Sequence, residues 1–335
     1  MVWEDYNMIR LVKKSLRIGI VASLSTIIGT VTAMGASWDM PTPYPDATFH
    51  TVNIKKFADD VKAATNGQLT IKVHSAGSLF KHKQIKKSVR GGQVPIGEFF
   101  MGLLANENPV FAMDTLPFLA SDYAAARKLW KVTKPKISAL LAKQGLSVLF
   151  SVPWPPQGVY AKKLIDKASD LKGLKFRAYN ASTTRLATLA GAVPTQIEVA
   201  DLAQAFATGR VQAMITSPST GVGSKAWDFL SHFHHTQAWI PKNVVVVNNK
   251  ALSRLDAALQ KAVLAAAAKA EARGWKMSQA ETDQKIAVLK KNGIKIVTPS
   301  ANLMGSLKNI GKIMSAEWSK KAGDQGQALL RAYNN

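Results

Sequence analysis

Residues 170–190, DLKGLKFRAYNASTTRLATLA, place a strand directly before a helix. Leu174–Tyr179 predicts a strand. Ala181–Ala190 predicts a helix, because serine and threonine, which are favoured near helix starts, open it. Val199–Thr208 predicts a second helix, stopped by a glycine, and Val211–Thr216 the next strand. This alternation is typical of α/β units.

A similar series precedes this segment. Thr51–Thr65 has apolar residues at helical spacing, and Leu69–Val73 alternates as a strand does. Val94–Phe99 and Leu146–Val152 are apolar strands, and Tyr123–Gln144 reads as one or two helices. The two series together predict an α/β fold with a sheet rich in parallel strands.

Two features indicate how the halves connect. Trp154–Pro156 breaks regular structure and suggests a crossing between lobes, and Val244–Val247 suggests a strand buried on both faces or a hinge strand. Leu252–Asn292 has strong helix propensity, so we expect a long helix that either lies across both lobes or breaks near Gly274. Ile294–Val297 predicts a further strand, and a helical segment follows it.

The composition fits a folded chain with enough apolar residues for two lobes. Of 335 residues, 47% are hydrophobic and 19% charged. There is no cysteine, which excludes disulfides, thiolate metal sites and cysteine nucleophiles. The net charge is +23, but Lys and Arg are spread along the helices without a nucleic-acid-binding motif. We therefore expect a solvated basic surface and no nucleic-acid partner.

The N-terminal segment has the layout of a secretory signal peptide. No acidic residue occurs between Met8 and Trp38, and Met8 is itself a candidate start. The apolar run Ile18–Val31 is shorter than the roughly 20 residues of a spanning helix, so an uncleaved anchor is the weaker alternative. We expect residues 1–36 to be a signal peptide and the mature protein to be periplasmic. The basic residues before the apolar run are Arg10, Lys13, Lys14 and Arg17.

Several blocks resemble the solute-binding proteins of TRAP transporters, the DctP family. Asp170–Arg177, DLKGLKFR, is similar to the family signature "D-L-K-G-L-K-hydrophobic-R". Asn66–Ile71, Val89–Val94, Leu116–Leu119 and Ala213–Ser217 match further family blocks in the same order. The resemblance spans essentially the whole mature chain.

This resemblance implies a two-lobed periplasmic binding protein fold with hinge strands, a long helix that spans the lobes, and a ligand cleft between them. The first lobe is expected to hold residues 37–153 and about 243–282. The second lobe is expected to hold residues 154–242 and about 283–335. The family's ligands are mostly organic acids, which the protein delivers to membrane subunits driven by an ion gradient.

In the family an arginine holds the ligand's carboxylate, and Arg177 stands at the matching position. A guanidinium stays protonated and offers a planar fork that matches a carboxylate. The sequence departs from the sialic-acid-type members at two places. Gln157 stands where they carry another arginine, and Thr216 and Ser217 stand near where they carry an asparagine. One fixed positive charge favours a monocarboxylate, with aromatic, hydroxy and keto acids as candidates.

Five other residues are candidates for the ligand site. The aromatic ones either line an apolar part of the cleft or belong to the ordinary core. Glu98 lies in a predicted strand, where it orients Arg177, accepts from a ligand hydroxyl, or is an ordinary surface carboxylate. The aromatic candidates are Trp154, Tyr160, Tyr179 and Phe118.

Patterns that would indicate catalysis are incomplete. His232, His234 and His235 form an H-x-H-H cluster, but no carboxylate or cysteine at metal-ligand spacing completes it. Gly221–Gly223 lacks the lysine and third glycine of a phosphate loop, and there is no G-x-S-x-G elbow. The sequence therefore predicts no metal, no cofactor and no enzyme activity.

Three kinds of protein remain compatible with these residues. The resemblance favours a binding protein that captures a small organic acid, works with TRAP membrane subunits and acts as a monomer. The alternatives are a ligand-binding module that serves a sensor and a periplasmic enzyme that acts on organic acids. Stoichiometric binding without turnover separates a binding protein from an enzyme, and a neighbouring transporter gene favours transport over sensing.

Overall fold

Three sheets organise residues 35–335, the part of the chain that the computed structural model describes. In the first lobe, β1 (Ala36–Pro41) pairs in parallel with β2 (Leu69–His74). In the same lobe, β10 (Lys242–Asn248) lies antiparallel between β3 (Ile96–Phe100) and β4 (Leu146–Pro153). The apolar strands expected from the sequence are therefore present, within a few residues of the predicted bounds.

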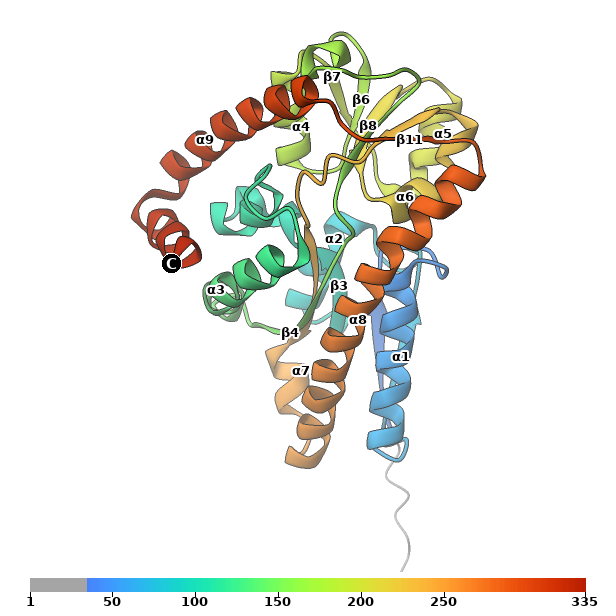
Figure 1. Ribbon diagram of the computed structural model, residues 1–335. Helices are drawn as coiled ribbons and strands as arrows, with labels where there is room; N and C mark the ends of the chain where they lie inside the picture. Colours follow the sequence, from blue (N-terminus) through green and yellow to red (C-terminus); the bar gives the residue numbers. More distant parts are fainter. Residues whose placement is uncertain (1–34) are drawn as a thin grey trace, which may run out of the picture. The chain divides into compact units, whose positions relative to one another are not determined.

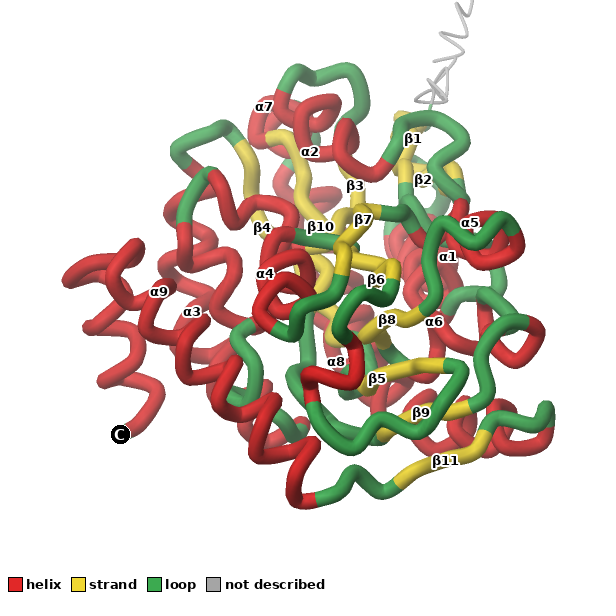
Figure 2. Tube along the Cα trace, turned by 90° about the horizontal axis from the view of Figure 1, so that it is seen from above, coloured by secondary structure: helices red, strands yellow, loops and turns green. Residues whose placement is uncertain are grey.

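The second lobe contains one sheet of six strands, in the order β11-β9-β5-β8-β6-β7 (Figure 2). Its β6, β7 and β8 are mutually parallel, and β9 is parallel to β11, but β5 is antiparallel to both of its neighbours. The strands are β5 (Gly158–Ala161), β6 (Lys175–Ala178), β7 (Val193–Gln196), β8 (Ala213–Thr216), β9 (His232–His234) and β11 (Lys295–Val297).

The prediction of a sheet rich in parallel strands is wrong, because antiparallel pairs are as common as parallel ones. Strands β5 and β10 cause the difference. Each enters its sheet directly from the other lobe, so no strand–helix–strand crossover fixes it parallel to its neighbours.

The helices follow the predicted positions closely. The predicted helices 51–65 and 181–190 are confirmed as α1 and α4, and the segment 123–144 forms a single helix, α3. Asn180 caps α4 by accepting a hydrogen bond from the Thr183 backbone amide. The helices are α1 (Phe49–Ala64), α2 (His82–Arg90), α3 (Tyr123–Ala142), α4 (Ala181–Leu189), α5 (Leu202–Ala207), α6 (Pro218–Gly223), α7 (Asn249–Ser253), α8 (Ala257–Lys291) and α9 (Ala301–Asn334). Short 3₁₀ helices are η1 (Met101–Asn106), η2 (Pro109–Thr115), η3 (Ala168–Leu171), η4 (Val199–Asp201) and η5 (Ala226–Asp228).

The long helix α8 spans both lobes (Figure 1). It starts at Ala257, after the separate short helix α7, and it runs for 35 residues without a break at Gly274. Its first half packs in the core of the first lobe through Val263 and Ala270, and Leu289 packs in a core of the second lobe. Gly274 allows close contact with β4, since a Cβ there would lie 2.4 Å from Cγ2 of Val152.

Two crossing segments join the lobes and are hydrogen-bonded to each other. Residues 154–157 lead from β4 to β5, and residues 235–241 lead from β9 to β10. The Trp154 amide donates to the Pro241 carbonyl at 2.8 Å, and the Gln157 amide donates to the Trp239 carbonyl at 3.0 Å. The four valines of β10 are at most 2% exposed, so the prediction of a strand buried on both faces is confirmed.

The last helix, α9, also contacts both lobes (Figure 1). Leu303 and Ile310 pack in the core of the second lobe, whereas Trp318 and Leu329 pack near α3 and η2 of the first. Gly323 interrupts the helical backbone between them, with a φ of 57°. The lobe boundaries expected from the sequence assign all of α9 to the second lobe, and they stay a prediction.

The predicted signal peptide, residues 1–36, lies outside the described residues except at its end. Ala36 is the first residue of β1. Within residues 35–335, the structure contains no helix that is both long enough and apolar enough to span a membrane.

We expect Gly274→Ala to lower the free energy of unfolding by about 1–3 kcal/mol, because the added methyl overlaps Val152. Gly305→Ala is the matched control, since its Cβ would meet open space on α9. That change should raise the free energy of unfolding by about 0.5–1 kcal/mol. Urea denaturation checks both values. Equal effects of the two changes would contradict the tight contact between α8 and β4.

Candidate ligand-binding site

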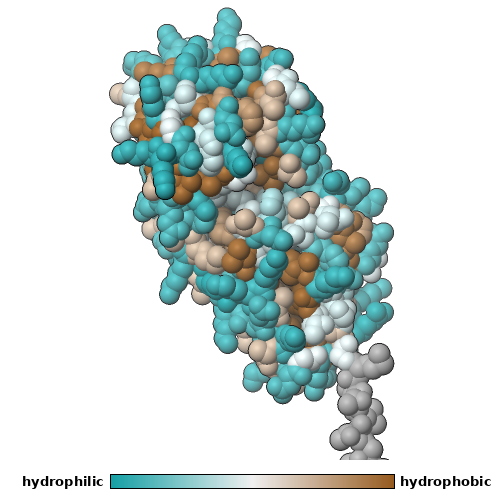
Figure 3. All heavy atoms as spheres, turned by 90° about the vertical axis from the view of Figure 1, so that its right-hand side faces the viewer, coloured by the Kyte–Doolittle hydropathy of each residue, from teal (hydrophilic) through white to brown (hydrophobic). Residues whose placement is uncertain are grey.

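A cavity of ≈ 70 Å³ lies between the two lobes, beside the crossing segments. This volume holds roughly five ordered waters, so it suits a small organic molecule. Figure 3 shows the surface hollowed between the two lobes, with hydrophilic side chains over much of the face on either side. Walls come from both lobes: Tyr44, His82 and Phe100 belong to the first, and Arg177 and Glu198 to the second.

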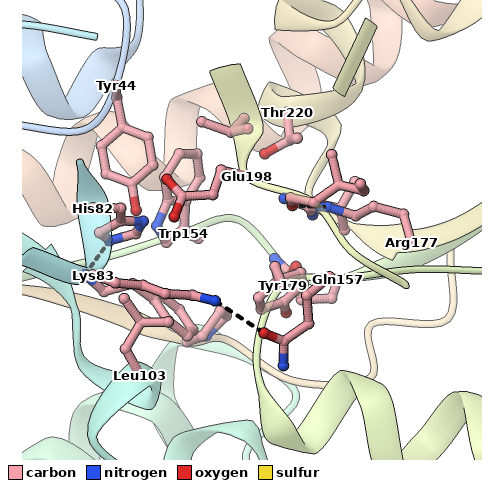
Figure 4. Close-up of a pocket in the computed structure, with 16 residues that line it drawn as sticks. Tyr44, His82, Lys83, Leu103, Trp154, Gln157, Arg177, Tyr179, Glu198 and Thr220 are labelled. Carbon is pink, nitrogen blue, oxygen red and sulfur yellow. Dashed lines mark hydrogen bonds between the residues drawn. The ribbon is translucent and has the colours of Figure 1, made fainter. Parts of the chain in front are cut away.

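Arg177 enters the cavity from β6 and is 4% exposed (Figure 4). Its Nε donates to the Ile197 carbonyl at 3.0 Å, and its guanidinium lies 4.9 Å from the centre of the Tyr179 ring. Burial lowers the pKa of Arg177 to about 10, which leaves it protonated at neutral pH. Within residues 35–335 no carboxylate lies within ion-pair distance of it. A buried positive charge without a counter-ion favours an anionic ligand.

A chain of hydrogen bonds fixes the aromatic ring beneath Arg177. Trp239 Nε1 donates to the Tyr179 hydroxyl at 3.1 Å, and that hydroxyl donates to Gln157 Oε1 at 3.1 Å. Gln157 Nε2 in turn donates to the Pro155 carbonyl at 2.8 Å. Both ends of the Gln157 amide are therefore engaged by the protein. Gln157 lines the cavity, but its geometry makes it a support for Tyr179.

A second network stands behind the opposite wall. Asn243 Oδ1 accepts from the Tyr44 hydroxyl at 3.2 Å and from Trp154 Nε1 at 3.0 Å. Asn243 Nδ2 donates to Glu98 Oε1 at 2.9 Å. Glu98 thereby fixes which end of the Asn243 amide faces the two cavity residues. Tyr44 and Trp154 are held as a pair, with their rings edge to face at 5.0 Å.

Glu98 does not contact Arg177, contrary to one of the predicted roles. It is 1% exposed and its partners are Thr42, at 2.6 Å, and His50, at 3.1 Å, besides Asn243. Burial raises the pKa of Glu98, but hydrogen bonds from His50, Thr42 and Asn243 outweigh it and hold the pKa below its ordinary value. Glu98 is neither a surface carboxylate nor a residue that lines the cavity.

His82, the first residue of α2, presents a neutral imidazole at the cavity. The backbone amide of Phe100 donates to His82 Nε2 at 2.9 Å, so the proton of the neutral ring is on Nδ1. Burial lowers the pKa of His82 to about 4, because it penalises the charged form. Arg177 and Lys83 lower it further, whereas Glu98 raises it. His82 Nδ1–H is thus a fixed donor.

Glu198 contributes an acidic side chain to the same cavity, directly after the Gln196–Ile197 segment. Within the part of the chain that the structure describes, its carboxylate makes no side-chain hydrogen bond and no ion pair. Figure 4 shows Glu198 between Arg177 on one side and Tyr44 and Trp154 on the other. Thr216 and Thr220 add hydroxyl groups to the lining.

The structure brings five of the nine predicted residues to the cavity and places four elsewhere. Tyr160 is fully buried, with its hydroxyl 3.3 Å from the Ser217 carbonyl and its ring 4.4 Å from that of Phe233. Ser217 caps α6 by accepting from the Thr220 amide. Phe118 packs on the core of the second lobe, and Glu98 lies behind the wall. The five in the lining are Arg177, Gln157, Thr216, Trp154 and Tyr179.

Sequence reasoning missed several residues that line the cavity. Tyr44, His82 and Glu198 lie in loops or at a helix start, where neither periodicity nor a motif marks them. Thr220 lies three residues beyond the block Ala213–Ser217 that matched the family, and Lys83 is one of many lysines spread along the helices. Near Tyr44 the sequence has three prolines within residues 41–45. They predict a turn but do not indicate a ligand site.

One histidine of the cluster, His234, has backbone partners in this fold. His234 is fully buried, its Nε2 accepts from the Ile165 amide at 3.0 Å, and its Nδ1 lies 3.2 Å from the Val159 carbonyl. The ring therefore ties β9 and β5 to the loop at Ile165. Within residues 35–335, no three His, Asp or Glu side chains gather as metal ligands would.

Comparison with known proteins places the chain in a family. Residues 42–321 match the family described as bacterial extracellular solute-binding protein, family 7, or DctP. The chain belongs to this family, and the resemblance expected from the sequence is confirmed.

Three solved structures are similar over nearly the whole described chain. Two are Bordetella pertussis extracytoplasmic solute receptors binding pyroglutamic acid, DctP6 and DctP7. They are 45% and 46% identical, with 89% and 90% of this chain and 99% and 100% of theirs covered. The third is a marine metagenome TRAP solute-binding protein specific for pyroglutamate, 41% identical over 90% of this chain and 99% of that one. Each has a TM-score of 0.88, which confirms the predicted two-lobed fold.

We expect the imidazole of His82 to titrate near pH 4, because burial disfavours the imidazolium. NMR titration of the histidine ring protons measures this, with the His82 signal assigned by its loss in His82→Gln. His232, on the interior strand β9, gives a second ring signal in the same spectra. A His82 midpoint near 6.5 would show that the ring charges freely and would remove the fixed donor from the site.

Proposed function

We propose that this protein is the extracytoplasmic receptor of a TRAP transporter for a small cyclic monocarboxylate, with pyroglutamate as the first candidate. The observation that carries the proposal is Arg177, a buried cation in the cleft between the lobes that has no ion-pair partner within residues 35–335. Relatives at 41–46% identity are described as binding pyroglutamate, a five-membered lactam with one carboxylate. This supports the monocarboxylate that the single arginine predicted.

Arg177 takes the ligand's carboxylate in this proposal. Nε is already used by the Ile197 carbonyl, which leaves the terminal nitrogens for the ligand. Tyr179 holds the guanidinium from one side, so the cation is oriented before the ligand arrives. A charge-assisted pair of this kind contributes about 1.5–3 kcal/mol to binding.

Capture involves both lobes. Tyr44 and His82 lie on the first lobe and Arg177 on the second, so a ligand between them contacts both. Lys83 Nζ also donates to Gln196 Oε1 at 3.2 Å, a direct hydrogen bond across the cleft (Figure 4). Ligand contacts that exist only when the lobes are close shift the population toward the closed form.

The surroundings of the cleft suit an acidic ligand. Beside the first cavity lies a second one of ≈ 430 Å³, which shares His82 and Lys83 with it. Its lining also includes Lys87 and Arg90. Together with the net charge of +23, these side chains raise the local concentration of anions near the cleft.

The membrane subunits of a TRAP transporter are the proposed partner, and the closed form is the species they recognise. The protein acts as a monomer in the periplasm, exported by its N-terminal segment. It delivers its ligand unchanged, so the proposal includes no catalytic step.

We expect pyroglutamate to bind the mature protein and Arg177→Gln to weaken that binding about 10- to 150-fold, since the variant loses the charge-assisted pair. Arg185→Gln is the matched control, because Arg185 lies on the neighbouring α4 and pairs with Glu317 at the surface. That change should alter affinity by less than about 2-fold. Isothermal titration calorimetry measures both. Equal affinities in wild type and Arg177→Gln would overturn the anchoring role, and binding of non-acids alone would overturn the substrate class.

A further inference from the structure

The polar groups of the cavity form a pattern that is more specific than one positive charge. Arg177 supplies a cation, His82 Nδ1–H supplies a neutral donor, and Glu198 supplies an anionic acceptor. A ligand that satisfied all three would need a carboxylate, a hydrogen-bond acceptor and a hydrogen-bond donor in a small frame. Each of these needs follows from the protein side of the site.

Tyr44 is a second acceptor, because its own proton is already committed. Glu98 accepts from Asn243 Nδ2, which turns Asn243 Oδ1 toward the Tyr44 hydroxyl. The hydroxyl hydrogen points at that oxygen, so the lone pairs of the Tyr44 oxygen are what remain for a ligand. Glu98 is therefore a positioning residue: it sets the polarity of a group that it does not touch.

The carboxylate of Glu198 requires a hydrogen-bond donor on the ligand. It lines the cavity, and within residues 35–335 it has no side-chain hydrogen bond or ion-pair partner. Closing the cleft over an unpaired carboxylate is costly unless the ligand donates a hydrogen to it. The same charge repels a second carboxylate on the ligand, which disfavours dicarboxylates.

We propose that the cavity selects a carboxylate whose ring carries both an N–H and a C=O, that is, a lactam, and that Glu198 with Tyr44 accepts the ring N–H. His82 Nδ1–H donates to the lactam oxygen, and Arg177 holds the carboxylate. This inference rests on the proposed function and adds the groups that choose among small monocarboxylates. It assigns the specificity to Glu198, a residue that no family motif marked in the sequence.

The N–H is the feature that the test must isolate. Pyroglutamate is compared with 3-oxocyclopentanecarboxylate, in which a CH₂ replaces the ring N–H while the ring size, the carboxylate and the C=O remain. Isothermal titration calorimetry gives both dissociation constants for wild type, Glu198→Ala, Tyr44→Phe and Asp201→Ala. Asp201 is the matched control. It is an exposed carboxylate three residues after Glu198, and its side chain forms no cap hydrogen bond.

Wild type should bind the lactam at least about 10-fold more tightly than the carbocycle. In Glu198→Ala the two affinities should differ by less than about 3-fold, mainly because the lactam binds more weakly. Tyr44→Phe should reduce the preference for the lactam in part. Asp201→Ala should leave the ratio of the two affinities unchanged. Thermal unfolding without ligand shows that each variant is folded.

The outcomes separate this inference from the proposed function. If both compounds bind wild type equally and both need Arg177, the receptor for a monocarboxylate stands and lactam selection is overturned. An unchanged ratio in Glu198→Ala would likewise overturn the role of Glu198. If neither compound binds wild type, the pyroglutamate-type function itself fails.

Discussion

The buried charge of Arg177, which has no ion-pair partner within residues 35–335, is the constraint on which the rest of the site depends. A guanidinium that is 4% exposed, with no carboxylate in ion-pair distance among residues 35–335, favours an anionic ligand in the cleft. A set of buried hydrogen bonds fixes the position of this cation. Tyr179, Gln157 and Trp239 fix one wall, and the Ile197 carbonyl fixes Nε.

The two-lobed design explains why these side chains can meet a ligand from both sides. Crossing segments that are hydrogen-bonded to each other, together with α8 and α9, join the lobes while leaving the cleft between them. Asn243 lies at the start of the crossing strand β10, so its contact with Tyr44 and Trp154 links the hinge region to the wall of the cavity. The strand that leaves the hinge region, β10, therefore also orients the Tyr44 hydroxyl in the wall of the cavity.

Local patterns predicted most strands and helices, because β6, α4 and α8 carry their own periodicity and caps. Arg177 was found through the family signature. Tyr44, His82 and Glu198 were not found, since they meet only when three separate segments pack across the cleft. Tyr160 was misplaced because β5 is buried on both faces. Gly221 leaves room for the Tyr160 side chain, since a Cβ on Gly221 would lie 2.3 Å from the Tyr160 hydroxyl.

A crystal structure of the mature protein with pyroglutamate would show whether Arg177 holds the carboxylate of the ligand. We expect carboxylate oxygens within hydrogen-bond distance of the terminal nitrogens of Arg177, with the ring N–H toward Glu198 and the ring oxygen toward His82. A ligand whose carboxylate lies away from Arg177, or a closed cleft that excludes the acid, would contradict this expectation.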